Sequence, residues 1–255
     1  MSRSIPCIIF IYGPAGSGKT TFTWKFWEWS KENSEFNIAP VNFDPATMNL
    51  PYKPIFDIRD YVTARKFMEE FGLGPNGAIV KAVEESEKYL KKLFEAIDKS
   101  SCDYILLDTP GIMEVFVGRE VGRRIVDSLL ERYNIIGLFI MDSSIITKPS
   151  EYIYFKSLFI LSGLKLGIIT VPAWNKISKA SKVFKEISDL ELKELIEKLY
   201  SEPGLYTDAA ERLAKMIDKL EYAVRFLKVD ALSCKGFDDV ITTLHEIYCT
   251  CGDLT

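Results

Sequence analysis

Short, nearly continuous apolar runs recur along the chain, bounded by charged or turn-forming residues and separated by helical patterns. Continuous rather than alternating hydrophobicity is typical of strands in a parallel sheet that is covered on both faces. The alternation of strands and helices predicts an α/β fold with a mostly parallel, Rossmann-like sheet flanked by helices. We expect strands over residues 7–12, 38–43, 104–108, 135–141, 166–171 and 226–229.

The helical patterns lie between these runs, over residues 21–31, 79–100, 120–133, 151–162 and 237–248. Two stretches interrupt the alternation. Residues 46–76 contain three prolines, and residues 177–222 are charged and amphipathic, with a helix break around residues 201–204. The second stretch predicts a helical insertion in a single domain that spans residues 1–255. The insertion serves either as a surface helical pair or as a lid or partner surface that responds to the ligand.

The most informative motif follows the first predicted strand. Residues 13–20 read Gly-Pro-Ala-Gly-Ser-Gly-Lys-Thr, a complete G-x-x-x-x-G-K-[ST] phosphate loop, with an apolar strand before it and a helical pattern after it. Glycines let backbone N–H groups turn inward around an anion, and the following helix presents its positive end. The motif therefore predicts a P-loop NTPase. We expect phosphate contacts from Gly13, Ala15, Gly16, Ser17, Gly18, Lys19, Thr20 and Thr21.

Two predicted strands end in carboxylates. Asp108 follows four apolar residues and precedes Thr-Pro-Gly, as expected of an acidic residue that serves Mg²⁺ beside a phosphate loop. Gly111 can bring its backbone N–H near a γ-phosphate. Asp44 either helps to hold Mg²⁺ and orient the attacking water, or caps an Asx turn. Because parallel strands end at one edge of a sheet, we predict a metal site formed by Thr20, Asp44 and Asp108.

Another strand runs into Asn175 and Lys176. In the Asn-Lys-x-Asp motif of guanine-binding domains, the asparagine braces neighbouring loops, the lysine stem covers the base, and the aspartate accepts from guanine N1–H and the exocyclic amine. Here Ser178 stands in the fourth position, and a neutral hydroxyl cannot replace the anionic acceptor. We expect Asn175 and Lys176 to contact the base.

Composition narrows the range of partners and locations. The net charge is −4, so no basic field draws the protein to nucleic acid or anionic lipid. The segment before the first strand is too short for a signal peptide, and no apolar run approaches the length of a membrane span. The five cysteines are scattered and lack zinc-binding spacing. We expect a cytoplasmic protein without a membrane span or direct nucleic-acid binding.

A set of motifs, in this order, resembles one family. Residues 44–46 read Asp-Pro-Ala, residues 74–77 Gly-Pro-Asn-Gly, residues 108–111 Asp-Thr-Pro-Gly, and residues 249–253 Cys-Thr-Cys-Gly-Asp. Over essentially the whole chain, this pattern resembles the GPN-loop GTPases of the archaeal branch. The resemblance implies a Mg²⁺-dependent homodimer that converts GTP to GDP and phosphate. Taken alone, Gly-Pro-Asn-Gly would indicate only a tight turn before a helix.

The resemblance also implies roles for partners. Asn76 would reach across the dimer to the γ-phosphate in the partner subunit, where its amide donates to a phosphate oxygen without adding charge. The family is associated with the assembly of multi-subunit complexes, notably RNA polymerase, and the archaeal client is open. We therefore expect a conformational switch with an unidentified protein client.

Two departures from the family pattern affect catalysis and base selection. Ile112 stands where relatives carry a glutamine able to position water, although Glu114 keeps the family's acidic position. The family's Ser-Ala-Lys turn aligns with residues 230–232, so Leu232 replaces its lysine. The resemblance still implies that the Ala231 backbone N–H donates to guanine O6. Guanine is therefore the preferred base, and an ATP-tolerant NTPase is the alternative. We expect slow hydrolysis. The predicted catalytic residues are Lys19, Asp44, Asn76 and Glu114.

Two other functions remain open at this point. A nucleotide-dependent scaffold with incidental hydrolysis is favoured by Ile112, which cannot hydrogen-bond through its side chain. A small-molecule or polynucleotide kinase would need an acceptor pocket with a base and arginine clamps. The sequence shows no signature for either of these kinase features.

Overall fold

The computed structural model describes residues 5–111, 113–201, 207–221 and 225–252. Within these ranges the strands form one parallel sheet, and they are β1 (Cys7–Tyr12), β2 (Ile38–Asn42), β3 (Phe56–Asp57), β4 (Tyr104–Asp108), β5 (Asn134–Asp142), β6 (Thr170–Asn175) and β7 (Leu227–Lys228). Their spatial order is β3-β2-β4-β1-β5-β6-β7. Every pairing is parallel, so all strands end at one edge. The predicted α/β architecture is confirmed.

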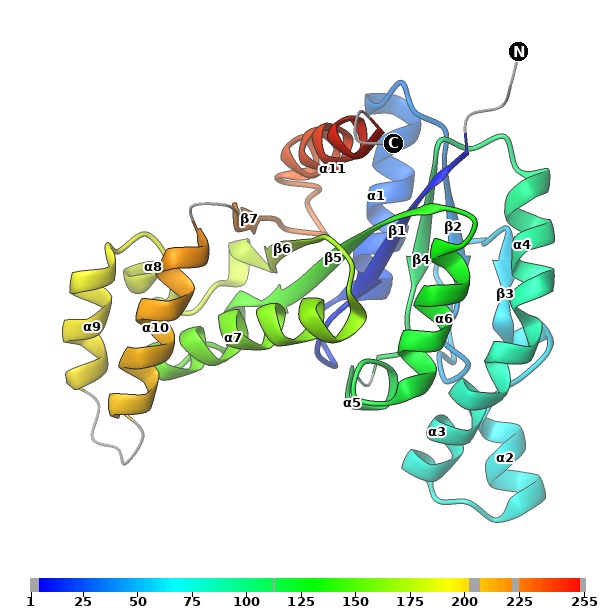
Figure 1. The fold of residues 1–255 in the computed structure, drawn as a ribbon, viewed down its shortest axis with the longest axis horizontal. Helices are drawn as coiled ribbons and strands as arrows, with labels where there is room; N and C mark the ends of the chain where they lie inside the picture. Colours follow the sequence, from blue (N-terminus) through cyan, green and yellow to red (C-terminus); the bar gives the residue numbers. More distant parts are fainter. Residues whose placement is uncertain (1–4, 112, 202–206, 222–224, 253–255) are drawn as a thin grey trace.

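Helices cover both faces of this sheet (Figure 1). They are α1 (Lys19–Asn33), α2 (Ala64–Phe71), α3 (Pro75–Ser86), α4 (Leu90–Lys99), α5 (Met113–Phe116), α6 (Glu120–Leu130), α7 (Pro149–Leu166), α8 (Lys182–Ile187), α9 (Leu192–Tyr200), α10 (Thr207–Glu221) and α11 (Phe237–Gly252). Alternate residues of β1 enter two separate cores. Ile8 and Phe10 pack with helices α3 to α7, whereas Ile9 and Ile11 pack with α1 and α11. Burial on both faces explains the continuous apolar runs.

One predicted strand was placed too early. The apolar run over residues 166–171 predicts a strand, but Leu166 is the last residue of α7. Gly167 ends that helix in the left-handed conformation, with φ at 65°. The strand that follows is β6, and its last five residues are buried. The apolar run thus belonged partly to a buried helix end, which hydrophobicity alone does not distinguish from a strand.

The helix predicted over residues 79–100 is divided. Helix α3 ends at Ser86, residues 87–89 form a 3₁₀ turn, and α4 begins at Leu90. The buried Ser86 hydroxyl donates to the carbonyl of Ala82 at 2.7 Å. Such bonding back to the preceding turn bends helices, which accounts for a break that hydrophobic periodicity does not reveal.

The proline-containing stretch between β2 and β4 holds two elements that the sequence analysis did not predict. Strand β3 forms the edge of the sheet next to β2. Helix α2 begins after Thr63, whose hydroxyl accepts from the Lys66 N–H. Helices α2 and α3 pack together and project beyond the edge where the strands end, with their connecting turn at the far tip (Figure 1).

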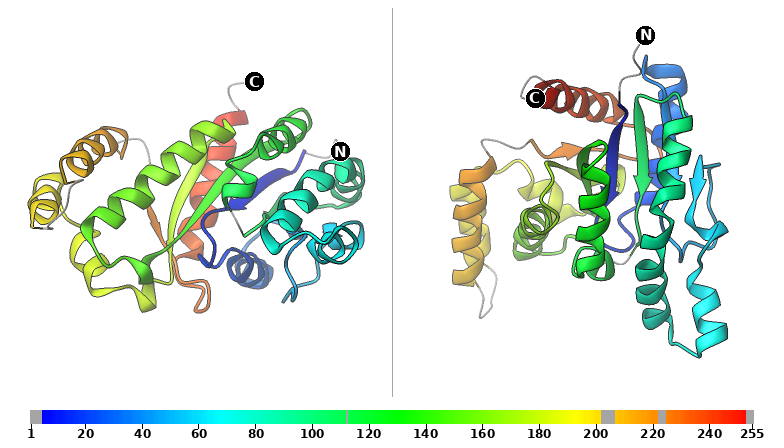
Figure 2. Two further views of the ribbon diagram at one scale, coloured as in Figure 1. Left: turned by 90° about the horizontal axis from the view of Figure 1, so that it is seen from below. Right: turned by 45° about the vertical axis from the view of Figure 1, so that its right-hand side comes forward.

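The predicted insertion between β6 and β7 contains α8, α9 and α10. Helix α10 packs against α9 and α7, at the opposite end of the molecule from α2 and α3 (Figures 1 and 2). Residues 202–204 of the expected helix break lie outside the described residues. Among the helices that the structure describes, none is long and apolar enough to cross a membrane.

Candidate functional site

The phosphate-loop motif connects β1 to α1 at the edge where the strands end. Gly18 caps α1 in the left-handed conformation, with φ at 94°. A Cβ atom on Gly18 would lie 2.6 Å from Nδ2 of Asn175, and one on Gly13 would lie 2.3 Å from the carbonyl oxygen of Ile140. Glycine is therefore required at both ends of the loop, by backbone conformation and by close packing.

The ammonium group of Lys19 donates hydrogen bonds to backbone carbonyls of this loop. Its Nζ lies 2.9 Å from the carbonyl oxygens of both Gly13 and Pro14, and 3.4 Å from that of Gly111. The side chain is buried, so its charge acts in a poorly screened environment. The buried hydroxyl of Ser17 has no hydrogen-bond partner within the described residues. A buried cation and an unpaired donor at a helix N-terminus fit an anionic ligand.

Asp108 lies at the end of β4 and is fully buried. Tyr52 donates its hydroxyl to Oδ2 at 3.0 Å, whereas Oδ1 has no hydrogen-bond partner in the part of the chain described. Burial raises the pKa of Asp108 to about 7 against the lowering effect of the Thr20 and Tyr52 hydroxyls, and the negative charge of Asp44 adds to the rise. An unpaired carboxylate oxygen beside a threonine hydroxyl fits a hard cation such as Mg²⁺.

The geometry of Asp44 is compatible with both predicted roles, as the cap of an Asx turn and as a group that contacts Mg²⁺ or the attacking water. Its Oδ1 accepts from the Ala46 N–H at 2.9 Å and its Oδ2 from the Thr47 hydroxyl at 2.8 Å, so it caps an Asx-type turn. Its charge nevertheless acts on Asp108. Each carboxylate oxygen can accept a second bond, so the turn leaves Asp44 able to contact a metal-bound or attacking water.

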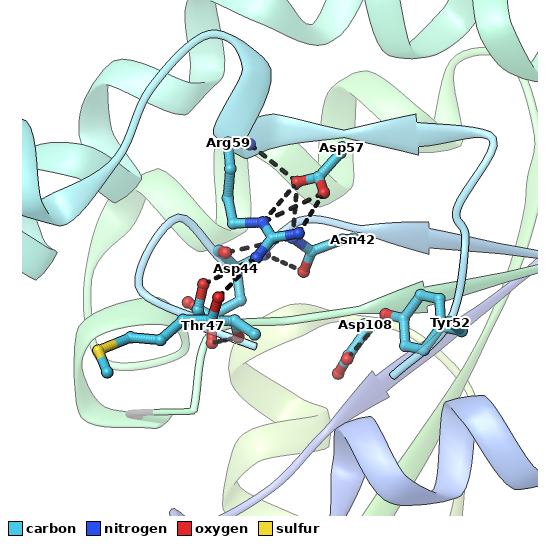
Figure 3. Close-up of polar contacts among 8 residues, drawn as sticks. Asn42, Asp44, Thr47, Tyr52, Asp57, Arg59 and Asp108 are labelled. Atoms are coloured by element: carbon cyan, nitrogen blue, oxygen red, sulfur yellow. Dashed lines mark hydrogen bonds and ion pairs between the residues drawn. The ribbon is translucent and has the colours of Figure 1, made fainter. Parts of the chain in front are cut away.

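A second polar cluster lies beside Asp44 and was not found by sequence reasoning (Figure 3). Arg59 donates to Asp57 through Nη2 at 2.6 Å and Nε at 3.0 Å, and through Nη1 to the carbonyl of Thr47 at 3.1 Å. Asn42 also donates to Asp57, at 2.8 Å. This cluster ties the turn that carries Asp44 to strand β3. These residues and Tyr52 match no motif, because only folding brings them together.

On the other side of the loop, Asn175 braces its neighbours as the sequence analysis expected. Its Nδ2 donates to the carbonyl of Ser17 at 2.9 Å, and its Oδ1 accepts from the Ala231 N–H at 3.0 Å. Lys176 reaches the carbonyl of Gly16 at 2.8 Å and Oδ2 of Asp142 at 2.5 Å. Because the Ala231 N–H already serves Asn175, guanine O6 can use it only by sharing or displacing that bond.

A cavity of about 540 Å³ opens beside these residues. Its walls include Gly18, Thr21, Asn175, Lys176, Ala231 and Leu232. The structure thus brings the helix end of the phosphate loop together with the three residues predicted to contact a base. The size of the cavity is in the range of small-molecule sites.

Two predicted catalytic residues and the departure at Ile112 have a different status. Asn76 is exposed in the first turn of α3. Glu114 belongs to the short helix α5, but its side chain is not described. Ile112, the residue predicted to slow hydrolysis, lies outside the described residues. The roles of all three stay predictions.

Known proteins resemble this chain over nearly its whole length. A profile of a family described as "conserved hypothetical ATP binding protein" matches residues 11–250. GPN-loop GTPase PAB0955 of Pyrococcus abyssi is 37% identical, over 97% of this chain and 100% of its own. GPN-loop GTPase 1 of Dictyostelium discoideum is 30% identical, over 92% of this chain and 59% of its own length.

A solved structure extends the similarity to three dimensions. The crystal structure of PAB0955, described as a GTPase in apo form, aligns with a TM-score of 0.83 at 33% identity. The alignment covers 96% of this chain and 98% of the other. The sheet, both helical layers and the insertion therefore lie within the compared region.

Proposed function

This chain belongs to the GPN-loop GTPases, and from that premise we propose that it binds GTP and hydrolyses it to GDP and phosphate by direct attack of water. The observation that carries the proposal is the convergence of Lys19, Asp108 and the Asn175–Lys176 pair around one phosphate loop. PAB0955, which is 37% identical to this chain, is named a GTPase, and this name supports the same reaction.

In this proposal the chain's own groups position the triphosphate. Residues 13–21 hold the phosphates, with Lys19 directed at the β- and γ-phosphates. Thr20 and Asp108 hold Mg²⁺, and Asp44 contributes through water. When bound, Mg²⁺ would neutralise the negative charge that develops on the transferred phosphoryl group. Asp44 and Glu114 orient the attacking water, and Gly111 brings its backbone close to the γ-phosphate. Catalysis then comes from preorganised charge rather than a covalent intermediate.

The proposal includes a homodimer. Asn76 is exposed at the start of α3, and α2 and α3 project from the edge of the sheet (Figure 1). This exposure supports a role for Asn76 at the partner's γ-phosphate rather than at its own. We further assign the dimer to the cytoplasm, as a nucleotide-dependent switch in the assembly of a macromolecular complex whose identity is open.

Phosphate release tests the enzymatic part of this proposal. Wild-type protein with Mg²⁺ should release phosphate from GTP, and Lys19→Ala should lower kcat/KM on the order of 10²–10³-fold, because it removes a buried charge from the phosphates. Lys193→Ala, on the exposed face of α9, is the matched control. The absence of release by the wild type, or equal release by Lys19→Ala, contradicts the proposal.

A nucleotide-dependent scaffold is the second candidate, favoured by the engagement of both Asp44 oxygens in a local turn. Comparison of Asp44→Ala with the wild type separates the two functions. Loss of turnover with intact GTP affinity supports the enzyme. Turnover that is low in the wild type and unchanged in Asp44→Ala supports the scaffold and assigns Asp44 to the turn alone.

A further inference from the structure

The cavity beside Lys176 contains a carboxylate to which the sequence analysis gave no role. Asp230 follows β7, is only 4% exposed, and lines the cavity together with Ser178 and Ala231. Among the described residues that line this cavity, Asp230 is the one that carries a carboxylate. The cavity therefore holds one fixed negative charge on its wall.

Three donors hold this carboxylate in place. Its Oδ2 accepts from the Ser178 N–H at 3.0 Å and from the Ser178 hydroxyl, and its Oδ1 accepts from the Ser233 N–H at 3.2 Å. Burial raises the pKa of Asp230, but these bonds to Ser178 and Ser233 outweigh burial and keep it below the usual value. Asp230 is therefore ionised at neutral pH.

Guanine and adenine differ at the edge that such a group can read. Guanine presents N1–H and an exocyclic amine, which are adjacent donors, whereas adenine presents an unprotonated N1 that only accepts. An ionised carboxylate accepts hydrogen bonds and donates none. It therefore pairs with the guanine edge, whereas adenine would place the lone pair of N1 against a negative charge. A site that requires a hydrogen-bond donor discriminates strongly against a base that lacks one.

In the Asn-Lys-x-Asp motif and the Ser-Ala-Lys turn, an aspartate would occupy position 178 and a serine position 230. This chain has the reverse, and the Ser178 hydroxyl donates to Asp230. A carboxylate and a serine hydroxyl thus meet between the loops that follow β6 and β7, as in the two motifs, but each stands in the other's position. The departure at Ser178 that weakened the sequence prediction is matched by a compensating residue 52 positions later.

We propose that Asp230 is the specificity-determining residue of this site and accepts from guanine N1–H and the exocyclic amine. A carboxylate has about four acceptor positions, of which three are engaged, and rotation of the Ser178 hydroxyl releases another. The inference rests on the proposed function, since it deepens the description of the same nucleotide site.

Nucleotides that differ only at C2 of the base provide the test. GTP has an amine there, ITP a hydrogen and XTP a carbonyl oxygen. Wild-type protein should bind GTP more tightly than ITP or XTP. Asp230→Asn should weaken GTP binding about 10–100-fold, as expected for loss of hydrogen bonds to a charged group. It should also favour XTP over GTP, because the new amide donates to the C2 carbonyl. Titration calorimetry with the non-hydrolysed analogues measures each affinity.

The control is Asp189→Asn, which removes a carboxylate that pairs with Lys228 outside the cavity and should leave every ratio unchanged. A second variant exchanges the two groups back, as Ser178→Asp with Asp230→Ser. It should regain the preference for GTP, whereas Ser178→Asp alone places two carboxylates together and should weaken GTP binding.

The outcomes separate this inference from the function on which it rests. If Asp230→Asn weakens GTP, ITP and XTP equally, or if the exchange variant does not recover GTP preference, Asp230 only caps its turn and the inference is wrong. If the wild type binds none of the nucleotides, the proposed function itself fails, and the inference fails with it.

Discussion

At the scale of single residues, the site is defined by polar groups that folding has buried. Asp108 is the clearest case, because one of its oxygens is bonded to Tyr52 and the other has no partner among the described residues. An unpaired buried carboxylate oxygen lowers stability unless a cation or water satisfies it. This cost is consistent with a group retained for binding rather than for folding.

The raised pKa of Asp108 predicts how stability depends on pH. The folded state favours the protonated carboxyl, so the metal-free protein should lose stability as the pH rises toward and through about 7. Asp108→Asn does not titrate. In EDTA, the Tm of the variant minus that of the wild type should therefore increase from about pH 5.5 to about pH 8.5, by several degrees.

Thermal unfolding followed by circular dichroism measures this difference. Glu69→Gln, on the exposed side of α2, controls for the removal of a carboxylate. A constant difference between Asp108→Asn and wild type at every pH would contradict the expectation. Addition of Mg²⁺ should raise the Tm of the wild type more at high pH and leave that of Asp108→Asn nearly unchanged, because the proposed ligand is absent.

At the scale of elements, an aromatic cluster joins the insertion to the sheet. Trp174 of β6 is stacked on Tyr152 of α7, with ring centroids 5.3 Å apart. Phe184 of α8 forms an edge-to-face pair with Trp174, with ring centroids 5.0 Å apart, and is itself buried. Trp174 directly precedes Asn175, so the same strand carries both the attachment of the insertion and the start of the base-side loop.

Phe184→Ala should therefore loosen the insertion. Loss of this buried ring is expected to reduce the free energy of unfolding by about 3–5 kcal/mol. Proteases should then cleave residues 182–221 before the strands, because α8 loses the buried ring that packs on Trp174. Urea unfolding and limited proteolysis measure the two effects. Leu164→Ala, at an exposed position of α7, should change stability by less than about 0.5 kcal/mol. Equal effects of the two variants would show that the cluster does not hold the insertion.

At the scale of the whole molecule, the two ends of the sheet carry different attachments. The insertion lies at one end, and α2 and α3 lie at the other (Figures 1 and 2). Asn76 lies in the first turn of α3 and does not line the cavity beside Asn175 and Lys176. In the proposed homodimer, Asn76 acts at the γ-phosphate of the partner subunit.

Mixing two inactive variants tests this arrangement. Lys19→Ala and Asn76→Ala should each release little phosphate from GTP as homodimers. After subunit exchange in equal amounts, half of the dimers carry both variants, and each has one complete site. Phosphate release should therefore recover to about one quarter of the wild-type rate, as expected for an isologous dimer. A mixture of Lys19→Ala with Asp108→Asn should not recover, because every site keeps one defect. No recovery in the first mixture would refute a role in trans for Asn76.

Prediction from sequence succeeded where the determining interactions are local. Strands β1 and β4 have the predicted bounds, because each is a short apolar run ended by a turn signal. It misplaced the boundary between α7 and β6, where burial from distant elements decides between helix and strand, and it missed the break between α3 and α4 after Ser86. The surroundings of Asp44 and Asp108 show the same limit, since Tyr52 contacts Asp108, and Asp57 and Arg59 hold the turn after Asp44, without any shared motif.

The amino-acid sequence by itself determined the phosphate loop, most of the order of strands and helices, and the carboxylates Asp44, just after β2, and Asp108, at the end of β4. These follow from glycine's backbone freedom and from hydrophobic runs, which are properties of neighbouring residues. Only the tertiary structure decided that Asp108 is left with an unpaired oxygen and that Asp230 faces Ser178. Both depend on contacts between segments far apart in the chain, whose geometry is set by packing on the common sheet.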